Sequence, residues 1–102
     1  MMAEPTTIRE AWAATLTRGR RAAAALDRRL DGQHTPRRPQ WDCHTCGQAW
    51  PCAPARVRLA EAYGRDRIGL SMYCGSLHPV ASEELPTAAP GELWERFVGW
   101  TR

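Results

Sequence analysis

The stretch PQWDCHTCGQAWPCAPAR, residues 39–56, contains three of the four cysteines of the chain. Cys43 and Cys46 are separated by two residues, and Cys52 follows after five more. The C-x2-C spacing lets two sulfurs turn back onto one point, and Gly47 permits the tight backbone turn that follows. A third sulfur then arrives at Cys52. Because zinc prefers four ligands in a tetrahedron, this pattern predicts a zinc site that lacks only its fourth ligand.

Two residues compete to be that fourth ligand. His34 lies eight residues before Cys43, in a proline-rich segment that can fold back without help from another helix. Cys74 lies within a predicted helix, one turn after Leu70, where a small buried apolar residue is expected. We favour His34, with Cys74 as the alternative.

The other two histidines are weaker candidates. His44 lies inside the loop between Cys43 and Cys46, where its side chain should point away from the ion and into solvent. His78 directly precedes Pro79, so we interpret it as a surface or cap residue. Neither is expected to bind the metal.

The cysteines have two other interpretations, as unliganded small hydrophobic residues or as a redox pair. A thioredoxin-like C-x-x-C should open a helix after a buried strand, and no strand is expected before Cys43. No apolar run approaches the roughly 20 residues that span a bilayer, and the N-terminus lacks the layout of a signal peptide. We therefore expect a cytoplasmic protein without a membrane segment, in which reducing conditions keep the thiols free.

The first 32 residues have the pattern of an amphipathic helix. Thr7 and Glu10 form a capping box at its start, and Asp31-Gly32 ends it. One face is predicted to carry the larger apolar residues Ile8, Trp12, Leu16, Leu26 and Leu30. The opposite side carries the arginines Arg18, Arg20, Arg21, Arg28 and Arg29.

Three further helices are expected after the cysteine segment, which we interpret as a loop or knuckle from Gln33 to Pro51. The first runs from about Pro54 to Tyr63 and places Cys52 at its N-terminus, where backbone N–H groups stabilise a thiolate. The second begins near Asp66 and ends before Pro86, with Pro79 kinking or splitting it. Its expected inward residues are Ile68, Met72, Leu77, Val80 and Ala81.

The last helix begins near Pro90. Its expected core face is Leu93, Trp94, Phe97, Val98 and Trp100. The predicted fold class is therefore mainly α, a small helical domain with a loop-built zinc knuckle. We divide it into an N-terminal amphipathic helix, residues 1–32, and a zinc-knuckle helical domain, residues 33–102.

The charge of the chain says little about its partners. All 14 basic residues are arginine, lysine and asparagine are absent, and the net charge is +3. This usage is typical of a GC-rich genome, so we interpret the arginines as a solvated surface. Nucleic-acid binding is expected to be weak and without sequence selectivity.

A group of roughly hundred-residue actinobacterial proteins shares an H-x8-C-x2-CG-x2-WPC signature, which this chain resembles over about residues 34–102. The residues that carry the resemblance are His34, Trp41, Cys43, Cys46, Gly47, Trp50, Pro51 and Cys52, with the closing LWERFVGWTR. The resemblance implies His34 as a ligand, since Cys74 falls outside the signature. Some of these proteins are labelled flavin reductases, although this chain has no glycine-rich phosphate loop.

A weaker similarity is to the WhiB-like iron-sulfur regulators, in which a C-x2-C-x5-C segment binds the cluster. Cys43, Cys46 and Cys52 match that spacing. The chain lacks the additional upstream cysteine of that family and the glycine-tryptophan turn with a basic tail. An iron-sulfur cluster held with His34 or Cys74 is thus the alternative to zinc.

Two functions follow from these patterns. The first is a non-catalytic zinc-binding domain that acts as a protein-interaction or regulatory module, with a surface beside Trp41 and Trp50 contacting the partner. The alternative is a redox protein, either an iron-sulfur regulator or a flavin-linked reductase. We favour the first because a closed four-ligand zinc site leaves no open position for substrate.

Overall fold

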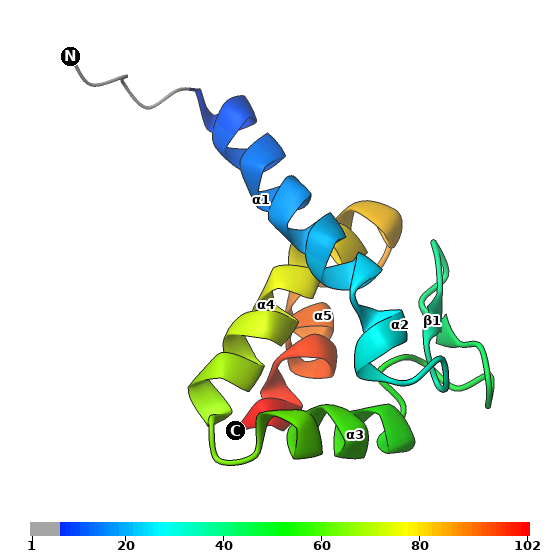
Figure 1. Ribbon diagram of the computed structural model, residues 1–102. Coiled ribbons are helices and arrows are strands. Elements are labelled where there is room, and N and C mark those ends of the chain that lie inside the picture. Colours follow the sequence, from blue (N-terminus) through cyan, green and yellow to red (C-terminus); the bar gives the residue numbers. More distant parts are fainter. Residues whose placement is uncertain (1–6) are drawn as a thin grey trace.

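Helix α4 (Arg67–Glu84) is the central element of the fold, and α1 (Ile8–Ala24), α3 (Ala53–Tyr63) and α5 (Pro90–Phe97) pack against it (Figure 1). The structure is a computed structural model that describes residues 7–102. The first six residues of the predicted segment 1–32 lie outside the described residues. The predicted class, mainly α with a small knuckle, is confirmed.

The N-terminal helix begins where its capping box predicts. The Thr7 hydroxyl accepts a hydrogen bond from the Glu10 N–H at 3.2 Å. The helix is interrupted at Ala25, and a short α2 (Leu26–Arg29) follows. Asp31 and Gly32 then end it with positive φ angles of 52° and 71°.

Helices α1 and α4 run antiparallel and approach closely. The Tyr73 hydroxyl donates to the Ala22 carbonyl at 2.5 Å, and the Trp12 indole donates to Glu83 at 2.8 Å. Gly19 permits the contact, because a Cβ at this position would lie 2.4 Å from the Ser76 carbonyl oxygen. Because the two helices are antiparallel in this register, the first turn of α1 lies beyond the end of α4. This first turn extends away from the other helices (Figure 1).

The core is one continuous cluster shared by all the helices. Its members from the predicted N-terminal helix include Leu16 of α1, Leu26 of α2 and Leu30 directly after α2, as the N-terminal pattern predicts. From α4, α5 and the residue that follows α5 it takes Leu70, Cys74, Leu77, Val80, Ala81, Leu93, Phe97 and Val98. The residues of the predicted N-terminal helix therefore share a core with residues 33–102.

Several residues that we predicted to lie on an apolar helix face, or to face inward, are exposed instead. Trp12 lies opposite the last turn of α4, and Ile8 lies one turn of α1 beyond it. Few residues of the fold are therefore near enough to cover them. Ile68 and Met72 are exposed because the buried face of α4 follows Leu70 and Cys74, and two positions correspond to about 200° around a helix.

The last helix and the prolines give further corrections. Trp94 is 47% exposed, because α5 presents Leu93 and Phe97 to the core. Trp100 lies beyond the end of α5 and is only half-buried. Helix α4 runs through Pro79 without being split, since the buried residues on both sides of the proline hold it against the core. It ends at Glu84, before Pro86, as predicted.

Candidate metal centre

The knuckle is built on a hairpin that the sequence did not predict. Strands β1 (Pro36–Arg37; Figure 1) and β2 (Asp42–Cys43) pair antiparallel, with Pro36 opposite Cys43. The Cys43 N–H donates to the Gln48 carbonyl at 2.7 Å, and the Gly47 N–H donates to the Cys43 carbonyl at 2.9 Å. Gly47 has a φ of 75°, which is the conformational freedom that the spacing required. These bonds close the loop that carries Cys43 and Cys46.

Four possible ligand atoms converge in this knuckle. One atom each from His34, Cys43, Cys46 and Cys52 lies within 4.8 Å of the other three. The His34 Nδ1 atom is 3.4 Å from Cys43 Sγ and 3.5 Å from Cys52 Sγ. A tetrahedral zinc ion with sulfur at about 2.3 Å and nitrogen at about 2.0 Å sets a sulfur-to-nitrogen separation of about 3.5 Å. The group therefore has the dimensions to hold a metal ion.

The hydrogen bonds around Cys43 favour its thiolate form. Burial favours its neutral thiol, but backbone N–H groups of Cys46 and Thr45 donate to Sγ at 3.4 and 3.3 Å. These donors outweigh burial and lower the pKa of Cys43 to about 6. The same turn that closes the loop thus stabilises the charge that a metal ligand needs.

Cys52 is positioned by helix α3, of which it is the N-cap residue, as predicted. Burial raises the pKa of its thiol to about 11. Without a cation in the site, Cys52 therefore stays protonated at neutral pH. Cys46, in contrast, is exposed to solvent.

The remaining cysteine and histidines lie apart from this group. Cys74 is buried in the core, and its burial raises the pKa to about 12, as expected for an inert apolar side chain. His44 is exposed, as predicted. His78 differs from the prediction of a surface or cap residue, because it is half-buried. Its Nε2 atom has no hydrogen-bond partner within residues 7–102, and its ring packs edge-on against Trp94 with centroids 5.5 Å apart.

The two tryptophans that flank the cysteines join the knuckle to the helices. Trp41 and Trp50 are buried, with ring centroids 5.1 and 6.0 Å from the ring of Phe97. The Trp41 indole donates to Glu84 at 2.9 Å, and Arg38 donates to the same carboxylate at 2.9 and 2.5 Å. The hydrogen bond from Arg38 lowers the pKa of Glu84.

Arg96 of α5 is a residue whose role the sequence did not suggest. Its guanidinium donates to the Trp50 carbonyl at 2.7 Å and to the Trp41 carbonyl at 2.5 Å. Burial lowers the pKa of this half-buried side chain. One arginine among 14 carries no distinguishing mark in the sequence, so only the fold identifies it. It fixes the backbone of the knuckle to the last helix.

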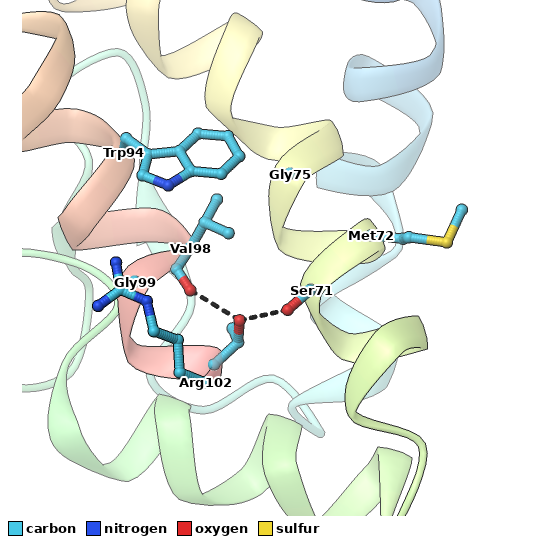
Figure 2. A pocket seen from close by; sticks show the side chains of 8 residues that line it. Ser71, Met72, Gly75, Trp94, Val98, Gly99 and Arg102 are labelled. Carbon is cyan, nitrogen blue, oxygen red and sulfur yellow. Dashed lines mark hydrogen bonds between the residues drawn. The ribbon is translucent and has the colours of Figure 1, made fainter.

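A second concave feature is a groove of about 460 Å³ between α4 and the C-terminal segment (Figure 2). Figure 2 shows Trp94 and Val98 on one side and helix α4, at Gly75 and Ser71, on the other. The Thr101 hydroxyl donates to the Val98 carbonyl at 2.7 Å and is 2.5 Å from the Ser71 hydroxyl, in the 3-10 turn η1 (Gly99–Thr101). The groove is mostly apolar and holds none of the four possible ligands.

Comparisons with protein-family models, curated proteins and solved structures give no match to this chain. Among the helices of residues 7–102, none has the length and apolar character needed to cross a membrane. The fold and the site together define a mainly helical small domain with a His/Cys group that could hold a metal ion.

Proposed function

We propose that the protein is a non-catalytic zinc-binding domain that acts as a protein-interaction or regulatory module, with His34, Cys43, Cys46 and Cys52 as the ligands. The observation that carries the proposal is the position of His34 Nδ1, 3.4 and 3.5 Å from two cysteine sulfurs. These separations match a tetrahedral zinc ion. Cys74 lies outside the group, which supports His34 as the fourth ligand.

The donor set and its size support one zinc ion over an iron-sulfur cluster. Three thiolates and one imidazole suit tetrahedral Zn²⁺. In a [4Fe–4S] cluster each protein ligand binds a different iron atom, so the ligand atoms must stand farther apart than around a single ion. A group whose ligand atoms all lie within 4.8 Å of one another favours the single ion.

A structural role follows from the number of protein ligands. Four of them fill the tetrahedron, so no coordination position stays open for water or a substrate. The ion would join the loop at His34, the hairpin at Cys43 and the start of α3 at Cys52. The binding free energy of such a site is largely folding free energy, because the ligands are dispersed in the unfolded chain.

The surface that we assign to a protein partner is the groove between α4 and α5, together with its exposed rim residues Met72 and Trp94. Tryptophan and methionine are enriched where proteins meet, and both side chains are accessible. From the sequence, we expect the partner surface beside Trp41 and Trp50. Their rings are buried, so a partner on that side of the knuckle would not contact them directly.

Weak nucleic-acid binding and a cytoplasmic location remain part of the proposal. Four of the arginines pair with carboxylates, which reduces the positive charge available to phosphates: Arg37 with Asp42, Arg38 with Glu84, Arg58 with Asp31, and Arg102 with Glu95. All four cysteines are free thiols, which suits a reducing compartment.

Native mass spectrometry of protein purified without oxygen tests the proposed metal. We expect one zinc ion per chain and no visible absorbance. Protein that is only metal-free, or that carries two or more irons, would contradict zinc. A flavin or iron-sulfur absorbance band would instead support the redox alternative.

A further inference from the structure

His34 has a backbone conformation that few residues other than glycine adopt. Its φ is 54°, in the left-handed region where a Cβ is crowded, so the surroundings must hold it there. Two side chains do so. The His34 N–H donates to the Thr45 hydroxyl at 2.9 Å, and the His34 carbonyl accepts from the Trp50 indole at 2.7 Å. Both the backbone N–H and the backbone carbonyl of His34 are therefore hydrogen-bonded to side chains of the cysteine segment.

Thr45 also contacts a sulfur of the site. Its backbone N–H donates to Cys43 Sγ at 3.3 Å while its hydroxyl accepts from His34. It lies between Cys43 and Cys46, directly before the exposed sulfur. The residue itself is exposed, so its hydroxyl is not required to fill the core. Thr45 thus connects the C-x2-C loop to the histidine that lies eleven residues earlier.

We infer that Thr45 is a positioning residue for the metal ligand His34, and that its hydroxyl selects the ring nitrogen Nδ1 for the ion. The hydroxyl holds His34 in the left-handed conformation, and in that conformation Nδ1 is the atom that lies beside two sulfurs. Without this bond, the backbone of His34 returns to the more populated region and the ring leaves the site. The inference rests on the proposed function, since it assigns a role toward the same ion.

The substitution Thr45→Val tests this, because it replaces the hydroxyl by a methyl of similar shape and keeps the β-branched side chain. Thr45→Ser keeps the hydroxyl. Thr35→Val is the matched control: it makes the same chemical change in the neighbouring loop, where the hydroxyl has no hydrogen bond within the described part of the chain. Co²⁺ is the probe, because its visible bands distinguish a site of three sulfurs and one nitrogen from one in which water replaces the nitrogen.

We expect Thr45→Val to bind Co²⁺ at least about 10-fold more weakly, as is typical when the group that orients a ligand is lost. The bands should shift toward the spectrum of His34→Ala, and the ¹⁵N signal of Nδ1 should lose its metal shift in the zinc form. Thr45→Ser and Thr35→Val should retain the affinity and spectrum of the unmodified protein.

Two results separate failure of this inference from failure of the proposed function. If the unmodified protein binds Co²⁺ with thiolate charge-transfer bands and Thr45→Val does the same with equal affinity, the positioning role is wrong while the metal site stands. If the unmodified protein shows no such bands, the metal site itself is wrong. A loss of affinity without a spectral change, shared by Thr35→Val, also contradicts the inference, because it reflects general loosening of the loop.

Discussion

The knuckle and the helical layer of α1 and α4 bury their apolar residues very differently. In the knuckle, with little regular secondary structure, Trp41, Trp50, Cys43 and Cys52 are all buried. In the helical layer, Ile8, Ile68 and Met72 stay exposed on well-formed helices. The contrast indicates what holds each region. Helix propensity and one packed face are enough for the helices, whereas the knuckle depends on two tryptophans, the bonds from Arg96 and, in the function that we propose, a bound metal ion.

The largest effect should come from removing the metal, which breaks the knuckle but not the helices. We expect a chelator, or Cys46→Ser, to reduce the free energy of unfolding by several kcal/mol. Trp41 and Trp50 should become exposed to solvent while much of the helical signal stays. Because Trp12 and Trp94 are already exposed, a change in tryptophan fluorescence reports mainly on Trp41 and Trp50, whereas far-ultraviolet circular dichroism reports on the helices. Equal loss of both signals would show that the regions are not distinct.

Acid should act in the same direction as the chelator. Zinc replaces the protons of the thiols, so apparent zinc affinity should fall as the pH falls. The pKa of about 11 for Cys52 means that metal binding must remove its proton throughout the neutral range, and below about pH 6 Cys43 is protonated as well. A titration of zinc affinity against pH checks the sign. Affinity that is constant between pH 8 and about pH 5 would argue against thiolate ligands.

Arg96 joins the two regions, and its loss should have the next largest effect. Arg96→Met keeps the length of the apolar stem but leaves the Trp50 carbonyl without its donor, and it removes one of the two donors to the Trp41 carbonyl, which keeps the N–H of Trp50. We expect a loss of about 2 to 3 kcal/mol, mainly from the buried Trp50 carbonyl left unpaired. Arg102→Met is the matched control, because its pair with Glu95 is exposed and contributes less than about 1 kcal/mol. Thermal unfolding of the two variants with zinc present gives the comparison. Similar losses of stability in both variants would show that Arg96 does not join the knuckle to the helices.

Cys74 tests whether the core and the site are independent. Cys74→Ser places a hydroxyl in an apolar core, so we expect a loss of about 2 kcal/mol with zinc retained. His34→Ala should instead bind zinc much more weakly and lose part of the stability that the ion supplies. Unfolding curves and metal content of both variants decide the matter. If Cys74→Ser loses zinc and His34→Ala keeps it, the fourth ligand has been assigned wrongly.

The same contrast explains how much could be predicted from the sequence. The convergence of Cys43, Cys46 and Cys52 follows from short spacings, and His34 lies close enough in the chain to join them. The helix limits at Thr7, Gly64 and Pro90 also depend on neighbouring residues only. Such local features were predicted well, because no distant contact decides them.

The errors lie where a distant partner decides the outcome. Spacing on the helical period places Ile68 and Met72 on one stripe, but the position of α5 and α1 determines that Leu70 and Cys74 face the core instead. The roles of Arg96 and of the Thr45 hydroxyl require knowing which backbone groups approach them in three dimensions. A two-residue strand is too short to leave an alternation of apolar and polar residues, so the hairpin gave no signal.

The smallest effect should come from the exposed apolar residues of α4. We expect Ile68→Ser and Met72→Ser to change the free energy of unfolding by less than about 0.5 kcal/mol, since surface substitutions remove little packing. Leu70→Ala, on the buried face of the same helix, should cost about 2 to 5 kcal/mol. Urea unfolding of the three variants measures this difference between two faces of one helix. A loss above about 1 kcal/mol for Met72→Ser would mean that a second copy of the chain covers this face in solution. In that case the loss should diminish on dilution, since dilution would also remove the contact from the unmodified protein.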